Sequence, residues 1–551
     1  MFRKRDPQVD LFESSNFLPP EKAARLHKTW ADAFRRMALP LIDEGRFAAL
    51  YSDGTGRPNK AVEVVLGVLV LKEMFDLTDN EALEQLEFNL LWHHALRLKP
   101  EDAHLCQKTL HNFRAGLMQH DLGRLAFEET TDRILRALQI NVSKQRLDST
   151  HIISNMATLT RLGLFCETIR VFLTSLRSAH PRLFGRAPLG ICRRYLKEDG
   201  TETSYGDARS SEGRRRLSVC ARDAYRLWDL FRGTAAAGLE EYDLLNRLVT
   251  EQCEVVSSKD CPDDDDDDAG EGGVPVRLKA AKEVKGDSLQ SPHDPDATYS
   301  GHKGKGYEVQ VVESCDPSNA VEIITDVAVT DSCDGDAGAT IPLLEGLVER
   351  GLLPKELVAD TSYGSAENAV DAACLGTELV SPVGGKAEPE APEEEALTAA
   401  DFDIDPGYGR PTVSPEGHES IGEEADSAAP HRVEIAFARG VCEACPRFGQ
   451  CPALLSRDGE RYILKADLRR LNIERRRRAE ARGDFAPRYS IRAGIEATNS
   501  ELKRAHGLGR PRVRGRPRVE LAVYIKALAC NIKRLVRATL AANAEPVAAA
   551  G

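Results

Sequence analysis

The chain has 551 residues, 42% of them hydrophobic, and a formal net charge of −13 at pH 7. At about 150 residues per domain, this length predicts three or four folded units rather than one core. No apolar run is long and uncharged enough for a membrane span, no apolar segment follows the basic N-terminus, and the 13 cysteines are mostly scattered. These features argue against a membrane protein or a secreted disulfide scaffold, so we expect a soluble cytoplasmic protein with reduced thiols.

Residues 20–140 have the pattern of a helical domain. A helix is expected to begin at Pro20, and an apolar helix is expected over residues 61–75. Thr78 and Glu81 form a capping-box pattern that starts the next helix after a short turn. With the segment from Thr109 to Arg114, these helices are compatible with a helix-turn-helix that lies against DNA, although such pairs also occur in other helical domains.

An acidic residue interrupts the first predicted strand. The segment Asn141–Ile152 is rich in β-branched residues and contains Asp148. A carboxylate in an apolar strand is costly to bury unless it binds something, and the alternative is an ordinary strand-end Asp that caps a turn. Residues 155–248 return to a helical pattern, and the acidic run 263–268 with nearby glycines predicts a disordered link.

Strand patterns resume after this link. Residues 306–312 and 320–329 are expected to form a hairpin, followed by a helix over 340–350 that ends at Gly351. A further strand ends at Asp360, and residues 377–381 form a fifth candidate strand. The loop 331–336 carries three Asp residues in a calcium-like pattern, but it lacks the downstream Glu of an EF-hand, so we predict that it caps the helix.

Three cysteines are clustered in a polar insertion. Cys442, Cys445 and Cys451 include a C-x2-C pair, a spacing that can hold one zinc ion from a single turn. His418 or His431 could supply a fourth ligand. The alternative is a set of unmetallated thiols.

Charge is unevenly distributed along the chain. Acid concentrates at 263–268 and 388–426, and base concentrates at 461–518. The basic part contains the run Arg475 to Arg478 and an alternating series at 510, 512, 514, 516 and 518. We expect these arginines to contact phosphates of a nucleic acid, and the alternative is a solvated arginine-rich linker.

A helix is predicted near the C-terminus, over residues 489–503. At about 100° per residue, Tyr489, Arg492, Glu496 and Lys503 share a sector of roughly 60°, so that one phenol, two cations and one carboxylate form a single ridge. Such a ridge could hold a metal ion and phosphates together. The alternative is a solvated helix face on which Arg492 and Glu496 form an i,i+4 ion pair.

Three of these motifs, in this order, resemble a known family. The spacing Y-x2-R-x3-E-x6-K is similar to the YREK signature of DDE transposases of bacterial insertion sequences. Residues 147–152 resemble the first-Asp motif of that family, residues 358–364 resemble its second, and residues 294–305 resemble the segment leading into its second strand. The resemblance implies an α/β fold with an RNase H-like mixed sheet, an N-terminal all-helical domain, a helical insertion and a Cys-containing polar insertion.

The resemblance also implies a mechanism. Asp148, Asp360 and Glu496 would be catalytic and would hold two Mg²⁺ (or Mn²⁺) ions about 4 Å apart, with Asp148 bridging both. The residues expected to contact double-stranded DNA, at the element ends and the target, are Tyr489, Arg492, Lys503, Arg510, Arg512 and Arg514. A homo-oligomer on DNA is expected, nucleoid-associated in a bacterial cytoplasm, with no membrane partner.

Two other functions fit the same residues. A catalytically inactive, transposase-derived DNA-binding protein would keep the fold without cutting. A repair nuclease, or a nuclease of RNA/DNA hybrids, could use the same sheet, although the large N-terminal helical domain argues against it.

The expected domain boundaries follow these patterns. They are 1–140 for the N-terminal helical, DNA-binding domain, 141–156 for the first strand of the RNase H-like core, 157–293 for the helical insertion and acidic link, 294–385 for the rest of the core, 386–484 for the polar insertion with the cysteine cluster, 485–540 for the catalytic-helix segment and C-terminal helix, and 541–551 for the tail.

Overall fold

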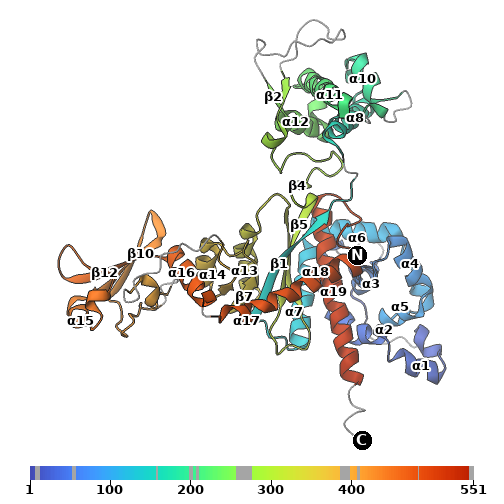
Figure 1. Ribbon diagram of the computed structural model, residues 1–551. Helices are drawn as coiled ribbons and strands as arrows, with labels where there is room; N and C mark the ends of the chain where they lie inside the picture. Colours follow the sequence, from blue (N-terminus) through green and yellow to red (C-terminus); the bar gives the residue numbers. More distant parts are fainter. Residues whose placement is uncertain are drawn as a thin grey trace.

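The computed structural model describes residues 1–6, 13–52, 58–156, 159–197, 203–206, 210–255, 276–384, 397–405, 410–481 and 483–544. The predicted acidic link at 263–268 and the acidic residues between 388 and 396 lie outside these ranges. The N-terminal helices lie on one side of a central sheet, a helical insertion extends from one end of the sheet, and a smaller sheet lies on the side away from the N-terminal helices (Figure 1). No helix within the described ranges combines the length and apolarity needed to cross a bilayer.

The N-terminal region is helical, as the sequence predicts. Its helices are α1 (Pro20–Leu26), α2 (Trp30–Ala33), α3 (Val62–Met74), α4 (Asp79–Phe88), α5 (Leu90–Ala95), α6 (Gln107–Gln119) and α7 (Leu122–Ala137). The capping box at the start of α4 is confirmed, because Thr78 and Glu81 each bond to the backbone of the other. Every residue of α3 is buried, and this helix packs against the long C-terminal helix α19 (Arg516–Ala544).

The central sheet mixes parallel and antiparallel pairs. Its strands are β1 (Lys144–Ile153), β4 (Thr298–Ser300), β5 (Gly304–Ser314), β6 (Ile324–Asp331), β7 (Glu356–Ala359) and β8 (Glu378–Val380). β5 pairs antiparallel with β1 and with both β4 and β6, whereas β1–β7 and β7–β8 are parallel. The predicted hairpin is therefore confirmed, and the principal order is β6-β5-β1-β7-β8.

Helices cover both faces of this sheet. α13 (Thr340–Glu349) and α14 (Ala366–Leu375) pack on Leu147 and Val312. Val309 and Val311 face a second core, which is shared with α7 and α19. Adjacent residues of one strand point to opposite faces, so β5 serves both cores. The predicted α/β, RNase H-like mixed sheet is confirmed.

The insertion between β1 and β4 has a core of its own. It contains α8 (Arg161–Ala179), α9 (Pro181–Phe184), α10 (Leu189–Tyr195), α11 (Ser210–Phe231), α12 (Glu240–Gln252), and the short pair β2 (Cys253–Val255) and β3 (Val276–Leu278). Phe172 is fully buried and contacts the rings of Phe231 and Tyr242. These aromatic contacts join α8, α11 and α12 into one packed unit.

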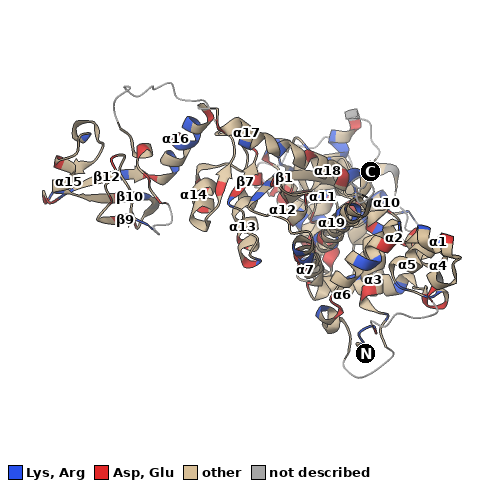
Figure 2. Cartoon of the chain, turned by 90° about the horizontal axis from the view of Figure 1, so that it is seen from below, with Lys and Arg blue, Asp and Glu red and all other residues tan. Residues whose placement is uncertain are grey.

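The cysteine-containing insertion holds a sheet that the sequence pattern does not reveal. β9 (Gly422–Asp426), β10 (Ala429–Ala438), β11 (Leu454–Leu455) and β12 (Arg461–Asp467) pair in the order β11-β12-β10-β9. α15 (Arg439–Glu443) follows β10, and α16 (Leu468–Ala481) runs back toward the central sheet. Figure 2 shows several basic residues along α16.

The helix predicted over residues 489–503 is interrupted, so this prediction is wrong in part. α17 (Phe485–Ser490) and α18 (Gly494–Ala505) are joined by a 3₁₀ turn at Ile491–Ala493. The buried Arg146 side chain donates a hydrogen bond from Nη1 to the Ile491 carbonyl, at 2.8 Å. A Cβ on Gly494 would lie 2.1 Å from the same nitrogen, so a larger residue there would displace this guanidinium from its contacts.

Candidate active site

Two of the predicted acidic residues lie on neighbouring strands. β1 and β7 are parallel, and their last paired residues are Leu147 and Ala359. Asp148 is the next residue of β1 and Asp360 directly follows the end of β7, so the register places them side by side. Asp148 is 13% exposed and Asp360 is 36% exposed, which leaves both carboxylates open on one side to solvent.

Arg492 joins these carboxylates to the third predicted acidic residue. Its Nη2 lies 3.0 Å from Asp148 Oδ1 and 3.7 Å from Asp360 Oδ2, and its Nη1 lies 3.5 Å from Glu496 Oε1. Glu496 is 68% exposed. One guanidinium therefore contacts three carboxylates that come from β1, from the end of β7 and from α18.

Tyr489 and Lys503, the other two side chains of the predicted ridge, lie in different environments near this cluster. Tyr489 stacks on Phe485 with ring centroids 5.2 Å apart, and burial raises its pKa. Burial lowers the pKa of Lys503, which also feels the charges of Glu308 and Asp148. Tyr489 and Lys503 thus border the carboxylates, although the 3₁₀ turn means that they do not lie on one regular helix.

Asn499 is a polar residue of this site that the sequence analysis missed. Its Nδ2 donates to Asp148 Oδ2 at 3.1 Å, while its Oδ1 is buried without a hydrogen-bond partner in the described structure. The signal was present in the spacing, because residue 499 follows residues 492 and 496 by seven and three positions on the same helix face. Asn499 fixes the orientation of the Asp148 carboxylate.

A fourth carboxylate approaches the site from the loop before α13. The Ser362 hydroxyl lies within hydrogen-bond distance of both Asp336 Oδ2, at 3.2 Å, and Asp360 Oδ1, and it can donate its single proton to either carboxylate. The prediction that loop 331–336 caps a helix is wrong, because the turn there begins after Gly335 without any side-chain cap. Asp336 is instead drawn toward β5 by the side chain of Gln310.

A network of buried ion pairs and hydrogen bonds joins β1, β5, α18 and α19 next to the site. Arg146 pairs with Glu313 at 2.6 Å, and Arg534 of α19 pairs with the other oxygen of Glu313 at 3.1 Å. Thr498 of α18 also donates to Glu313, at 2.7 Å. Because Glu313 is fully buried, its charge depends on these partners for compensation. This network fixes α18 against β1 and β5.

The donor set suits a hard divalent cation. Carboxylate oxygens are the protein ligands that Mg²⁺ and Mn²⁺ prefer, and few are needed because water completes the coordination. Burial raises the pKa of Asp148, Arg492 partly offsets that effect, and Asp360 adds to it. The three carboxylates do not form one of the ligand clusters within 4.8 Å found among the described residues. Arg492 contacts all three carboxylates and supplies the positive charge that such a cluster requires.

The arginines predicted to contact DNA connect distant parts of the chain. Arg512 Nη1 lies 2.9 Å from Asp76 Oδ1 and also reaches the Leu77 carbonyl. Arg514 donates to the Asn155 carbonyl, just beyond β1, and Arg510 reaches Met156 at 3.5 Å. These contacts place the run between the N-terminal helices and the start of the insertion.

Other arginines of the basic region have internal partners. Arg475 donates to the Phe402 carbonyl, and Arg476 donates to the carbonyls of Gly364 and Ser381. Burial lowers the pKa of both guanidinium groups. Their contacts anchor α16 to neighbouring segments, which is a structural role that the sequence pattern alone does not distinguish from phosphate binding.

The three clustered cysteines surround a small cavity. Cys442, Cys445 and Cys451 line a space of about 30 Å³ together with His418. Burial and the neighbouring thiols raise the pKa of Cys442. His431 points elsewhere, with Nε2 3.7 Å from Asp467. Of the two histidines considered as a fourth ligand, only His418 lines this cavity.

Comparison with known families gives two matches. The transposase DDE domain matches residues 415–536, and the transposase domain (DUF772) matches residues 16–116. No curated protein and no solved structure matches the chain. The first match includes Arg492, Glu496 and the cysteine cluster, whereas Asp148 and Asp360 lie outside both matches. The sheet register and the contacts of Arg492 connect these two residues to the matched region.

Proposed function

The two matches support a DDE transposase of an insertion element, and from that premise we propose that the chain binds the ends of its element and catalyses metal-dependent strand cleavage and strand transfer. The observation that carries this proposal is the convergence of Asp148, Asp360 and Glu496 on the single guanidinium of Arg492. These residues are far apart in sequence and come from separate elements.

Asp148, Asp360 and Glu496 would hold the divalent ions, Mg²⁺ or Mn²⁺. When bound, such ions activate the attacking oxygen and stabilise the charge that builds on the phosphoryl group. The chain's own residues position the reactants around them. Asn499 orients the Asp148 carboxylate by its hydrogen bond at 3.1 Å. Three carboxylates that hold metal ions suit direct attack by water or by a DNA 3′-hydroxyl.

Arg492 and Lys503 provide positive charge at the carboxylate cluster. A polyanion approaching three carboxylates meets repulsion, and cations beside them offset it. We propose that both side chains move to phosphates flanking the scissile bond when DNA binds, and that Tyr489 stacks on or bonds to the DNA. Arg492 would then exchange its carboxylate partners for phosphate oxygens, which it can contact in a bidentate manner.

Double-stranded DNA would also contact the arginines of residues 510–514 and the N-terminal helices. Arg512 is 48% exposed although it pairs with Asp76, so its guanidinium remains accessible from solvent. Phosphate contacts of this kind fix the position of a duplex without reading its sequence. A homo-oligomer that holds two element ends is part of the same proposal.

We also propose structural zinc at the cysteine cluster, with His418 as the fourth ligand. Three thiolates and one imidazole form a common closed zinc set. Their common cavity is small and lies within the insertion, separate from the carboxylates in the fold. The zinc would stabilise the small sheet and take no part in phosphoryl transfer.

The test uses purified protein and a duplex that carries the inverted repeats flanking the coding sequence. Cleavage is expected with Mg²⁺ and not with a chelator. Asp148→Asn, Asp360→Asn and Glu496→Gln should each abolish cleavage while the affinity for DNA is retained, because each removes a metal ligand. Asp371→Asn, a change at an exposed residue of α14, is the matched control and should cut normally. Cleavage at the parent rate by a triad variant would remove that residue from the proposal.

The same assay tests the alternative of an inactive, transposase-derived DNA-binding protein. Specific binding to the repeats without cleavage under any divalent ion would support that alternative. Absence of binding to the repeats would contradict both.

A further inference from the structure

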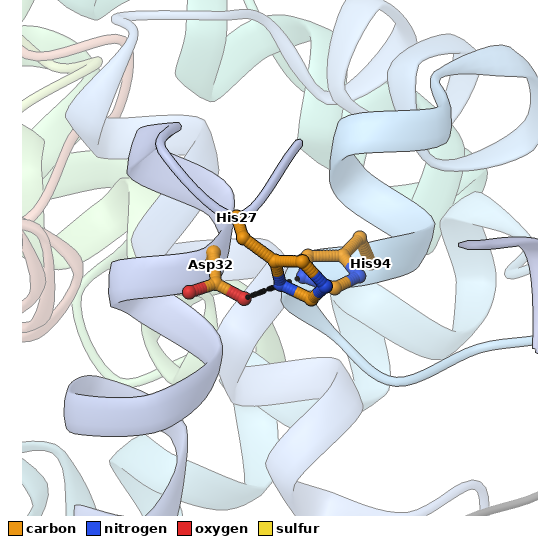
Figure 3. A group of neighbouring side chains, drawn as sticks. All are labelled: His27, Asp32 and His94. Carbon is orange, nitrogen blue, oxygen red and sulfur yellow. Dashed lines mark hydrogen bonds and ion pairs between the residues drawn. The ribbon is translucent and has the colours of Figure 1, made fainter. Parts of the chain in front are cut away.

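Two histidines and one aspartate meet in the N-terminal helical domain, remote from the carboxylate cluster. His27 directly follows α1, Asp32 lies in α2 and His94 lies in α5. Figure 3 shows the two imidazole rings directed at the same carboxylate oxygen. His27 Nδ1 is 2.9 Å and His94 Nε2 is 3.0 Å from Asp32 Oδ1, and all three atoms lie within 4.8 Å of one another.

We propose that His27, Asp32 and His94 form a binding site for a transition-metal ion of the zinc class. Two imidazole nitrogens and one carboxylate oxygen are a common protein ligand set for Zn²⁺, and imidazole disfavours Mg²⁺ and Ca²⁺. Ligand bonds of about 2.0–2.1 Å in a tetrahedron separate neighbouring donor atoms by roughly 3.3 Å. The observed separations of 2.9 and 3.0 Å are within a few tenths of an ångström of that value.

The surroundings of Asp32 support this assignment. Its second oxygen accepts a hydrogen bond from Arg36 Nε at 2.7 Å, and metal-ligating carboxylates are commonly held in this way. Asp32 and His94 are buried, which fixes two of the three donors before any ion arrives.

His27 leaves the site open to solvent. Its side chain is 62% exposed, so an ion has an entry path and water can occupy a fourth position. His27 and Asp32 lie close together in the sequence, whereas His94 is distant from both. Bound metal would therefore link α1 and α2 to α5 and stabilise the packing of these helices.

The competing account is a set of hydrogen bonds alone. In that account both rings carry a proton on the nitrogen that faces Asp32, and no ion enters. The two accounts differ in what added zinc does to the protein. Zinc would bind and stabilise the protein in the first account and would have no effect at this site in the second.

The experiment uses the full chain with Cys442→Ser and Cys451→Ser, so that the cysteine cluster does not compete for zinc. After chelation and removal of the chelator, zinc is titrated while bound metal and the thermal midpoint are measured. We expect stoichiometric zinc binding and a rise in the midpoint. Cobalt should give visible absorption without the strong thiolate bands of a cysteine site.

His27→Ala is the informative variant, because it removes an exposed side chain and leaves the core intact. It should weaken zinc binding by at least about tenfold and abolish the rise in the midpoint. His120→Ala changes an exposed histidine of the same domain and should behave as the parent. Absence of zinc binding in the protein with Cys442→Ser and Cys451→Ser, or equal affinity when His27→Ala is added to it, would overturn the proposal. Neither result depends on whether the protein cleaves DNA.

Discussion

Replacement of Arg492 by alanine should increase the affinity of the DNA-free protein for Mn²⁺. The guanidinium lies between carboxylates that would hold the ions, so it competes with them for the same oxygens. A metal ion can occupy the site only after Arg492 leaves its contacts with Asp148, Asp360 and Glu496. Alanine removes this competitor and keeps all three ligands.

The distances set the size of the effect. The contact of 3.0 Å with the largely buried Asp148 is a charge-assisted hydrogen bond, which contributes about 1.5–3 kcal/mol. The contacts at 3.7 Å with Asp360 and 3.5 Å with Glu496 are longer and more exposed, and such pairs contribute about 0.2–1 kcal/mol each. A net gain of about 2 kcal/mol corresponds to roughly thirtyfold tighter binding of Mn²⁺.

Calorimetry or electron paramagnetic resonance of Mn²⁺ titrated into each protein would measure this change. The matched control is Arg488→Ala, one turn earlier, which removes a cation bound to Glu378 at 2.6 Å and should leave Mn²⁺ affinity unchanged. In strand transfer the Arg492→Ala protein should be slow despite its higher metal affinity, because a phosphate ligand is lost. Equal or weaker Mn²⁺ binding in the Arg492→Ala protein would refute the reasoning and would show that Arg492 organises the carboxylates rather than competing for them.

Three further outcomes are expected. DNA affinity should fall steeply between about 50 and 200 mM salt, and Arg512→Ala should reduce both the affinity and the salt dependence measured by fluorescence anisotropy; a salt-independent affinity would favour a solvated linker. Cys442→Ser should hold one zinc ion fewer per chain than the parent by elemental analysis and should lower the melting temperature, and a variant that melts like the parent would contradict structural zinc. Burial raises the pKa of Asp326 to about 6, so its contribution to stability is present below its ordinary value and is lost as pH rises through about 6. Asp326→Asn should therefore gain up to about 3 kcal/mol relative to the parent between pH 4 and pH 8 in denaturant unfolding, whereas a pH-independent difference would contradict that burial cost.

Local patterns were sufficient for much of the fold. The strands that carry Asp148 and Asp360 were predictable because alternation and β-branched residues are visible within a few positions. The start of α4 was predictable because its capping box spans only residues 78–81. Such features depend on neighbours in the sequence, which is the information that a single chain provides.

Features that depend on distant contacts were not predictable. The 3₁₀ turn at 491–493 depends on Arg146, 345 residues away, which binds the Ile491 carbonyl. Strand β9 has an exposed and acidic sequence, Gly422–Asp426, so its pairing with β10 has no apolar pattern to reveal it. The partners of Arg475 and Arg476 are backbone carbonyls, and no sequence pattern identifies such acceptors.

The separate core of the helical insertion has a consequence for how the protein folds. β1 and β5 are neighbours in the central sheet, yet residues 154–303 separate them in the chain. Ser154 and Asp294 are hydrogen-bonded, so the two ends of the insertion lie close together. If the insertion folds first, the loop left to close is about fifteenfold shorter, which lowers the entropic cost of pairing β1 with β5 by about 2 kcal/mol. Mutations in the buried contacts of Phe172 would then slow formation of the central sheet, although they lie outside it.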